Sequence, residues 1–422
     1  MKKILIIFIW FLSLVLAIIY EHENPELLEK IKNYFKDDKN VVLGSKEGEI
    51  LRSPGNSFML EFSNVLSFSE SKNSIKTAFI IHNEKLLKFN EKNLTIYFQN
   101  GNLYKNSKLN EIALPKNFIT ERNGGIKAIF IYKNEQFALI SSKKNECYYS
   151  SIILLSKVKE IFSTQCLPDN NIDYNGLGSS HIHNEDKIFL SIGAPEQTNS
   201  TIRQLAQDKN SFYGKIVEID KKDLEQVIDG NNSEINPKIF TLGHRNPQGL
   251  TKIKDSLFSV EHGPKGGDEL NKIIRDKNYG WPKVSYGTRY IGDESGKSYE
   301  INHEINLFEE PLYALVPGVG ISGLNSCPSK LINYYKKPCL LALSLYGNSL
   351  RPGRSILIYL LNEKMDKVHS VEQIHLRNDL KLRHFVTNEK NELYEDKEGN
   401  IYISADKKGI YKLSFIFFRN WN

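Results

Sequence analysis

The sequence predicts an all-β protein, a six-bladed β-propeller of four-stranded antiparallel sheets that follows an N-terminal hydrophobic helix. Apolar and β-branched residues recur in short alternating runs, such as TAFIIH, KAIFIY, KIFLSIG and NIYISAD. Turn sequences such as NGN, NEDK and KEGN separate these runs, and no long helical periodicity follows residue 40. Short runs bounded by Gly, Asn and Asp are typical of antiparallel strands.

Strands of this kind must be arranged so that their sheet edges are protected. A propeller protects them by radial closure, and about 60 residues per blade would divide residues 41–422 into six blades. A pair of stacked β-sandwiches is the alternative, but it does not explain why polar motifs fall in loops between strands. We therefore expect one propeller over residues 41–422.

The first residues carry the pattern of an export signal. Lys2 and Lys3 precede an uncharged apolar run over residues 4–20, near the short end of the roughly 17–25 residues that span a bilayer. No small-residue cleavage site follows Ala17. We expect residues 1–20 to be a signal anchor or signal peptide and residues 21–40 a helical linker, although a buried core helix is an alternative. The rest of the chain would then lie in the periplasm, tethered to the inner membrane.

The net charge and the cysteines bear on the partners of the protein and on its redox compartment. The net charge of +6 is spread along the chain without a basic cluster, so we expect no nucleic-acid partner. Cys147 and Cys166 would face each other across a hairpin if a tight turn joins its strands, and Cys327 and Cys339 could form a second bridge. Disulfides would fit an oxidising compartment, and four free buried thiols are the alternative.

The most distinctive stretch runs from Gly243 to Pro282 and contains GHRNPQGL, EHGPKGGDELN and NYGWP. LTKIKDSLFSVE lies between the first two segments and predicts a strand, a turn and a second strand. Two polar, glycine-rich loops are therefore expected at the ends of neighbouring strands. Gly and Pro at this density form tight turns and allow the backbone to approach a ligand closely.

These three segments, in this order and spacing, resemble the soluble PQQ-dependent aldose sugar dehydrogenases of the glucose/sorbosone dehydrogenase family. The resemblance extends from about Gly176 to Leu413. It implies the same six-bladed propeller, which oxidises the C1 hydroxyl of aldose sugars to lactones with PQQ and Ca²⁺ as cofactors and an external electron acceptor. Because PQQ is a flat quinone with three carboxylates, a protein that holds it needs cations.

The resemblance also implies a set of binding residues. Arg suits a planar acid because its fork can bond both oxygens, whereas a Lys in the same position supplies charge alone. The main-chain carbonyls of Gly263 and Pro264 would bind calcium, which prefers oxygen ligands. The implied cofactor-binding side chains are Arg245, Asn246, His262, Lys381 and Arg383.

Other roles remain open for some of these residues. Asn246 could be a turn residue, and Lys381 with Arg383 could form a solvent-facing basic strand. The carboxylates of Asp268 and Glu269 lie close to the proposed calcium loop in sequence. We expect them to cap and order that loop, as Asp and Glu side chains often do for backbone N–H groups.

The catalytic positions depart from the family pattern. In the family, a His takes the proton from the C1 hydroxyl and an Asp orients that His. Counting back without gaps from KIFLSIGA places Asn175 and Ala194 at these two positions, and Asn cannot usefully accept a proton near neutral pH. His181 and His183 lie nearby and could take over, although we favour a core or surface role for both.

Two more positions differ, and they keep alternative functions open. Leu315 stands where the family has Trp, and Tyr346 falls near a family Lys that Arg351 or Arg354 could replace. We expect a sugar dehydrogenase. A catalytically degenerate propeller that binds a carbohydrate or cofactor is the alternative, and a calcium-dependent hydrolase or lactonase is a third possibility.

Overall fold

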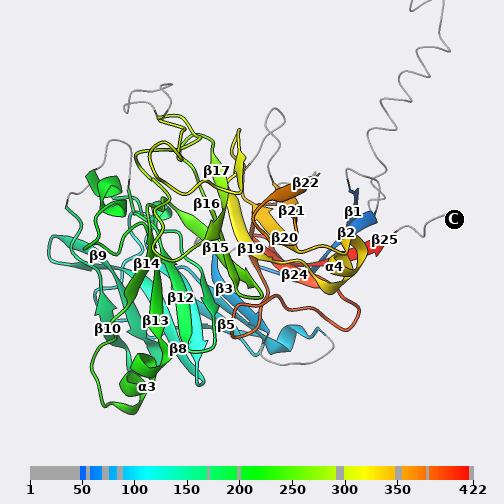
Figure 1. Ribbon diagram of the computed structural model, residues 1–422. Helices are drawn as coiled ribbons and strands as arrows, with labels where there is room; N and C mark the ends of the chain where they lie inside the picture. Colours follow the sequence, from blue (N-terminus) through cyan, green and yellow to red (C-terminus); the bar gives the residue numbers. More distant parts are fainter. Residues whose placement is uncertain are drawn as a thin grey trace, which may run out of the picture.

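The computed structural model describes residues 48–53, 58–68, 76–82, 89–168, 172–196, 201–290, 299–346, 354–376 and 380–417 (Figure 1). The helix expected over residues 1–20 and the linker expected over residues 21–40 lie outside these ranges. Within the ranges, no helix is both long enough and apolar enough to cross a membrane. The membrane tether therefore stays a prediction.

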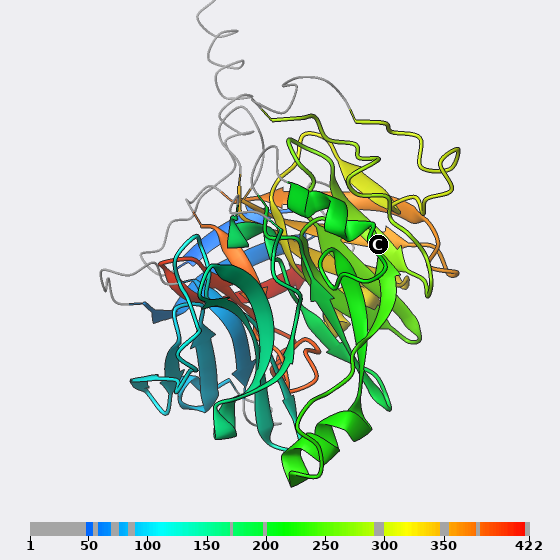
Figure 2. The ribbon, with the colours of Figure 1, turned by 90° about the vertical axis from the view of Figure 1, so that its left-hand side faces the viewer.

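The described residues form six antiparallel sheets around a ring, which confirms the predicted propeller (Figures 1 and 2). In five sheets the innermost strand is the first one along the chain, and in the sheet that contains both ends of the described chain it is β23. These six strands lie around the axis, where they contact one another. β15 contacts both β11 and β19, β23 contacts β19 and β3, and β3 also contacts β7. The inner strands are β3 (Thr77–His82), β7 (Ile126–Tyr132), β11 (His181–His183), β15 (Pro247–Ile253), β19 (Ile321–Ser326) and β23 (Leu382–Phe385).

Five of these sheets each take four consecutive strands from the chain. The strands that follow β3 and β7 are β4 (Leu94–Phe98), β5 (Asn102–Lys105), β6 (Lys108–Glu111), β8 (Glu135–Lys144), β9 (Cys147–Leu154) and β10 (Lys159–Ser163). Those that follow β11, β15 and β19 are β12 (Lys187–Ile192), β13 (Lys215–Asp220), β14 (Lys238–Leu242), β16 (Ser256–Glu261), β17 (Asp268–Ile273), β18 (Tyr313–Leu315), β20 (Cys339–Ser344), β21 (Ser355–Leu361) and β22 (Val368–His375).

The sixth sheet closes the ring and has five strands, one more than predicted. Its order is β1-β2-β25-β24-β23, so both ends of the described chain contribute. In Figure 2 the blue N-terminal strands lie beside the red C-terminal strand. β2 and β25 pair from Phe58 opposite Phe417 to Ser67 opposite Gly409. The strands not yet given are β1 (Gly48–Arg52), β2 (Phe58–Ser67), β24 (Ile401–Ala405) and β25 (Gly409–Phe417).

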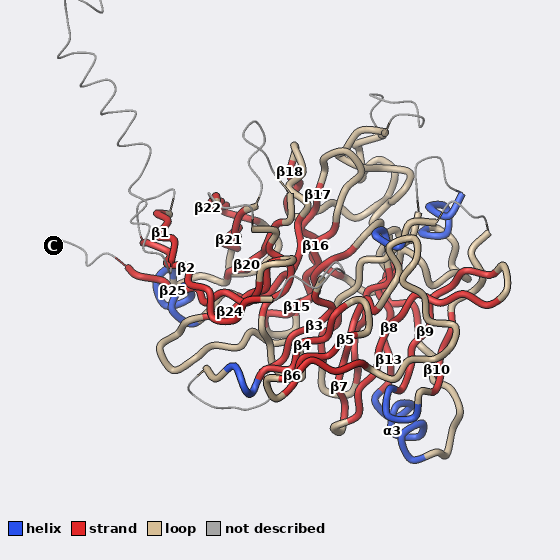
Figure 3. Tube along the Cα trace, turned by 180° about the vertical axis from the view of Figure 1, so that it is seen from behind, coloured by secondary structure: helices blue, strands red, loops and turns tan. Residues whose placement is uncertain are grey.

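Helices are short and lie at the margins of the sheets (Figure 3). α3 begins after Asp220, whose side chain accepts a hydrogen bond from the Lys222 N–H, and ends at Gly230 in the left-handed conformation. The helical segments are α3 (Lys221–Asp229) and α4 (Ser329–Tyr335), with 3₁₀ turns η1 (Glu91–Asn93), η2 (Leu155–Lys157), η3 (Tyr174–Gly176) and η4 (Thr201–Ala206).

Packing between neighbouring sheets explains the apolar strands. Every residue of β4, LTIYF, and of β21, SILIYLL, is buried. A strand in the middle of a propeller blade has neighbouring blades against both faces, so it gains from apolar side chains at successive positions. The core is therefore a series of layers between the sheets.

Both predicted disulfides are present, and the alternative of free thiols is wrong. Cys147 pairs with Cys166 and Cys327 pairs with Cys339, which leaves no free cysteine. The first bridge joins the ends of the β9–β10 hairpin, as the sequence predicts. The turn of that hairpin is the 3₁₀ segment η2, followed by Val158 with a φ of 47°.

Replacing Cys147 and Cys166 together by Ser should lower the stability of the protein. The bridge closes a segment with a sequence separation of 19 residues, and a loop of about this length contributes about 3 kcal/mol by restricting the unfolded chain. Urea denaturation would measure the change in the free energy of unfolding. The same change at Cys327 and Cys339, with a separation of 12, should cost slightly less; an unchanged midpoint in both variants would contradict this prediction.

Candidate functional site

A cavity of about 750 Å³ lies at the axis of the ring. Residues 173–179 before β11, 245–248 around the start of β15 and 262–268 between β16 and β17 supply much of its wall. Residues 318–320 before β19 and 345–346 after β20 add the next part. Lys76 and Gln99 flank β3 and β4, Lys127 belongs to β7, and Arg383 and His384 belong to β23. Every sheet therefore contributes to the cavity.

Glycines allow the loops of this wall to pack closely. A Cβ atom at Gly178 would lie 2.3 Å from Oδ1 of Asn246 and 2.4 Å from the carbonyl oxygen of Pro247. A Cβ atom at Gly263 would lie 2.1 Å from the carbonyl oxygen of Gly266. Neither position has room for a side chain, so the glycine-rich pattern follows from loop packing at the cavity.

Basic side chains outnumber acidic ones around the cavity. The acidic side chains in its wall are those of Asp173, Glu196 and Asp268. An excess of positive charge in a partly enclosed space favours an anionic ligand. The basic side chains are those of Lys76, Lys127, Arg203, Arg245, Lys265 and Arg383.

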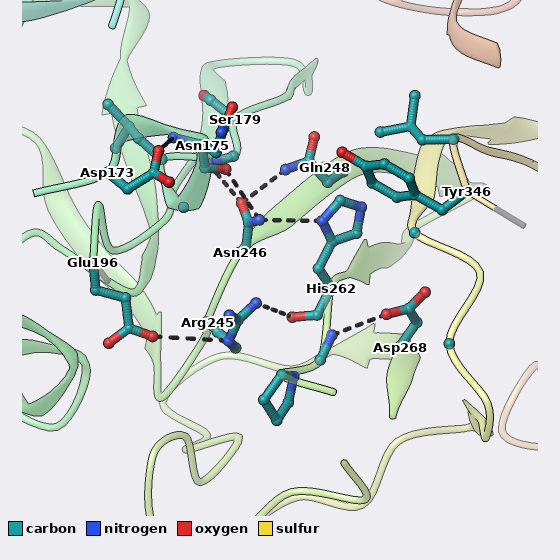
Figure 4. Close-up of a pocket in the computed structure, with 18 of the residues that line it drawn as sticks. Asp173, Asn175, Ser179, Glu196, Arg245, Asn246, Gln248, His262, Asp268 and Tyr346 are labelled. Carbon is teal, nitrogen blue, oxygen red and sulfur yellow. Dashed lines mark hydrogen bonds and ion pairs between the residues drawn. The ribbon is translucent and has the colours of Figure 1, made fainter. Parts of the chain in front are cut away.

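Arg245 is held at the cavity by contacts on several sides (Figure 4). Its main-chain N–H donates to Oε2 of Glu261 at 2.7 Å, and Nη1 donates to the carbonyl oxygen of His262 at 3.1 Å. Nε lies 3.8 Å from Oε1 of Glu196, and the guanidinium carbon lies 5.3 Å from the ring centre of Trp281. The guanidinium therefore stays next to the loop that contains Gly263.

Asn246 organises the neighbouring wall through both ends of its amide (Figure 4). Oδ1 accepts from the Gly178 N–H at 2.8 Å and from Nε2 of Gln248 at 2.7 Å, so the other end must be Nδ2. Nδ2 lies 3.2 Å from the Asn175 carbonyl oxygen and 3.2 Å from Nδ1 of His262. Because Nδ2 can only donate, Nδ1 of His262 accepts, and the neutral ring carries its proton on Nε2.

His262 is neutral near pH 7 in these surroundings. Burial lowers its pKa, and the positive charge of Arg245 acts in the same direction, while Asp268 opposes both. The ring is part of the cavity wall, but its Nε2 atom is buried.

Asp268 orders the loop between β16 and β17. Its Oδ1 accepts from the Gly263 N–H at 3.1 Å, and its Oδ2 accepts from the N–H groups of Val319 and Ile321 at 2.8 and 3.1 Å. The carboxylate thus joins this loop to the segment before β19. This arrangement agrees with the capping role expected for Asp268.

A buried polar network supports the same loop from behind. Oε1 of Glu261 lies 3.0 Å from Nδ1 of His244 and accepts from Asn271 at 2.9 Å. Asn271 also donates to Glu269 at 3.2 Å. Burial, together with the nearby Glu261, raises the pKa of Glu269 well above its usual range. Glu269 therefore belongs to the support of the loop and not to the cavity wall.

The calcium loop offers few ligands in this structure. Gly263 and Pro264 line the cavity as expected, but the Pro264 carbonyl oxygen accepts from the Tyr290 hydroxyl at 2.5 Å. The carboxylate of Asp268 is already engaged by three N–H groups. Within the described ranges, no group of three or more His, Cys, Asp or Glu residues could hold a metal ion.

The C-terminal basic pair is divided between two environments. Arg383 lines the cavity, and Asp406 accepts from its Nε and Nη2. Lys381 does not line the cavity; its Nζ lies 5.0 Å from the ring centre of Tyr346, which does. The placement of Arg383 is therefore compatible with the expected direct contact with a ligand. Lys381 contacts Tyr346 and is not itself part of the cavity wall.

The positions expected for catalysis also lie in different environments. Asn175 is exposed to the cavity, whereas Ala194 is buried with its N–H bonded to the Arg245 carbonyl oxygen at 3.0 Å. His181 and His183 are buried in β11 and do not line the cavity. The suggestion that either histidine replaces the catalytic base needs correction, because both side chains pack between the sheets. The ring of His181 lies 5.1 Å from that of Phe79.

Of the two altered positions, Tyr346 lines the cavity and Leu315 does not, and the possible replacement Arg354 also lies away from the wall. Leu315 is buried in β18 opposite Asp268, and Arg354 bonds through its N–H to the Tyr346 carbonyl oxygen at 3.0 Å. Neither lines the cavity, and Arg351 lies outside the described residues.

Sequence reasoning missed several residues of the wall, among them Lys76, Lys127 and Glu196. The signal for Lys127 was present, because a lysine interrupts the apolar strand IKAIFIY. Lys76 and Glu196 carry no comparable local signal.

Comparison with known proteins identifies a matching family and several relatives of the chain. The family model described as Glucose / Sorbosone dehydrogenase matches residues 113–410. Aldose sugar dehydrogenase YliI of Escherichia coli is 36% identical over 111 residues, which cover 25% of this chain and 28% of the relative. Quinoprotein glucose dehydrogenase B of Acinetobacter calcoaceticus is 34% identical over 143 residues, which cover 31% of this chain and 27% of the relative. The matched segment thus spans under a third of either relative.

Solved structures show the same fold. The soluble aldose sugar dehydrogenase of Escherichia coli in the apo-form has a TM-score of 0.61 at 20% identity, covering 84% of this chain and 99% of that chain. The PQQ-bound form of the aldose sugar dehydrogenase of Streptomyces coelicolor has a TM-score of 0.50 at 16% identity, covering 84% and 98%.

Replacing Asp268 by Ala should destabilise the protein and loosen the cavity wall. The change leaves the N–H groups of Gly263, Val319 and Ile321 without their acceptor, and we expect a loss of about 2–4 kcal/mol in urea denaturation. Asp208→Ala is the matched control, because Asp208 accepts one such bond, from Asn210, at an exposed position. Equal losses in the two variants would contradict the role of Asp268.

Stability should fall as the pH is lowered below about 6.5. Burial lowers the pKa of His183 to about 3 and that of His384 to about 4, whereas an unfolded His titrates near 6.5. The unfolded chain then binds protons that the folded chain does not. The contribution of these two histidines to the free energy of unfolding is therefore complete above about pH 6.5 and is lost as the pH falls toward 4. Urea denaturation at pH 7.5 and 5 should show the difference. His183→Gln should reduce it by about 1–2 kcal/mol, and an identical pH dependence would contradict the assignment.

Proposed function

Because the chain belongs to the glucose/sorbosone dehydrogenase family, we propose that it oxidises the C1 hydroxyl of aldose sugars to lactones with PQQ as the oxidant. The observation that carries the proposal is the excess of Lys and Arg side chains around a cavity on the axis of the ring. Three carboxylates on a flat molecule would be neutralised by such a wall. An external acceptor would then remove the electrons.

The residues of the wall support this assignment in different ways. When bound, PQQ would supply a quinone that accepts a hydride from the sugar. Arg245 and Arg383, from different sheets, offer guanidinium groups for its carboxylates. His262 adds a neutral ring to the wall, and Trp281 provides a flat apolar surface beside Arg245. Together these side chains can bind and orient a planar acid.

Calcium is a separate part of the proposal. The chain offers it the carbonyl oxygens of Gly263 and Pro264, one of which already accepts from Tyr290. No carboxylate of the described loop is left without hydrogen bonds, since Asp268 binds three N–H groups. The donor set does not fit a calcium site held by the protein alone, so we assign calcium no step in the reaction.

A non-catalytic binding protein is the second candidate function. Asn175 and Ala194 occupy the two positions at which the family resemblance implies a His and an Asp, and His181 and His183 lie outside the cavity wall. A protein without any proton acceptor would still bind a carbohydrate or the cofactor. It would show binding without turnover.

An extracytoplasmic location completes the proposal. Two disulfides support an oxidising compartment. The apolar run over residues 4–20 supports export and a membrane tether.

Titration of the purified protein with PQQ, with and without calcium, tests the proposed function. Binding should quench the fluorescence of Trp281 in the cavity wall, and the loaded protein should reduce a redox dye when aldoses are added. Binding without dye reduction would favour the non-catalytic candidate. Failure to bind PQQ in either buffer would exclude both the cofactor and the dehydrogenase.

Arg245→Lys should weaken PQQ binding by about tenfold, because Lys keeps the charge but loses the bidentate fork. Arg275→Lys is the matched control: Arg275 also makes a two-point contact with a carboxylate, that of Glu218, but outside the cavity. The control should bind PQQ like the unmodified protein. Equal affinities for all three proteins would show that Arg245 does not contact the cofactor.

A further inference from the structure

Lys127 is a buried lysine whose side chain reaches the cavity. It lies in β7, only 7% of its surface is exposed, and it forms part of the cavity wall. Its Nζ donates to the carbonyl oxygens of Asn123 and Tyr174, each at 2.8 Å. Tyr174 directly precedes Asn175, which lines the same cavity. The amine of Lys127 is therefore held beside Asn175, whose side-chain amide cannot accept a proton.

The two hydrogen bonds of Lys127 suit a neutral amine. A neutral amine has two N–H groups, which keep both carbonyl oxygens satisfied, and a lone pair at the remaining position. Lys215 provides the contrast, since its Nζ donates to three carbonyl oxygens, those of Leu205, Ala206 and Tyr213. Deprotonation of Lys215 would break one of these bonds, whereas deprotonation of Lys127 breaks neither of its own.

The charges around Lys127 also favour its neutral form. Burial lowers its pKa to about 7, and the nearby Lys76 and Arg383 act in the same direction. Asp173 has the opposite effect and raises the pKa of Lys127. Asp406 adds a second carboxylate nearby, through its ion pair with Arg383. A lysine with a pKa near 7 is divided between both forms at neutral pH, which is what a general base requires.

Four other titratable groups of the wall are less suited to this role. Oδ1 of Asp173 accepts from the Asn175 N–H at 2.9 Å and from Asn123 at 3.0 Å. Asp268 binds three N–H groups, and Nδ1 of His262 faces an amide donor. Burial and Arg383 lower the pKa of His384 to about 4, so it is a weak base.

We propose that Lys127 is the general base of the reaction and takes the role that Asn175 cannot fill. This inference rests on the proposed function. In the step, the C1–H bond would break and its electron pair would pass as a hydride to the quinone that PQQ supplies when bound. The O–H bond would break and its proton would pass to Nζ of Lys127, while the C–O bond becomes a carbonyl. The sugar would thus lose two electrons to PQQ, and the ammonium form of Lys127 would then release its proton to solvent.

The first test measures Lys127 directly and needs neither cofactor nor turnover. Acetic anhydride modifies neutral amines, so the acetylation rate of each lysine in the cofactor-free protein, followed by mass spectrometry against pH, reports its protonation. Lys127 should reach half-maximal reactivity near pH 7, well below the value of about 10.4 that is usual for a lysine side chain. An ordinary lysine profile for Lys127, or no reaction at any pH, would overturn the proposal.

The second test compares variants of the PQQ-loaded protein. Lys127→Ala should lower kcat/KM by about 10²–10⁴-fold and remove the rise in rate through pH 7. Added ethylamine should restore part of the rate, because a small amine can occupy the vacated space. Lys127→Arg keeps the charge and the carbonyl contacts but should stay inactive near neutral pH, and it serves if the alanine variant does not fold. PQQ affinity, measured alongside, separates a loss of proton transfer from a loss of cofactor binding.

Lys215→Met is the matched control for the loss of a buried lysine. It should lower stability but keep the pH profile of the unmodified protein. Equal losses of kcat/KM in Lys127→Ala and Lys215→Met, or an unchanged pH profile in Lys127→Ala, would overturn the role of Lys127. Neither result would contradict the proposed sugar dehydrogenase activity. A loaded, unmodified protein that reduces no dye would instead refute the proposed function, and the role of Lys127 with it.

Discussion

The pairing of β2 with β25 is the constraint on which the rest of the structure depends. These strands come from opposite ends of the described chain, and their hydrogen bonds close the ring. Lys76 leads into β3 just after β2, and Arg383 lies on β23 in the closing sheet. Closure therefore brings both cations to one side of the cavity, where each affects the titration of Lys127.

Holding several cations in a partly enclosed cavity is unfavourable unless other groups offset the charge. The protein offsets it locally, with Asp406 at Arg383, Glu196 at Arg245 and main-chain carbonyls at Lys127. These partners hold the side chains in place but leave the wall with a net positive charge. The same arrangement that stabilises the cavity wall thus prepares it for an anionic ligand and lowers the proton affinity of a buried amine.

The candidate site could be predicted from sequence where its residues are contiguous. Arg245, Asn246 and His262 lie within one stretch, and the structure brings them together at the cavity as expected. His181 and His183 are close in sequence to Asn175, which lines the cavity, but β11 carries them between the sheets. Proximity along a strand could not show this, because a strand leaves the cavity within a few residues.

The sequence by itself determined the ring of antiparallel sheets, the two disulfides and the polar loops of residues 243–282, since these depend on strand periodicity, turn residues and short spacings. Only the tertiary structure decided which charged side chains meet at the axis. Lys127 interrupts an apolar strand, and its neighbours Asn123, Tyr174 and Arg383 come from three different parts of the chain. Their contact depends on how the sheets pack around the axis, and no local pattern records that packing.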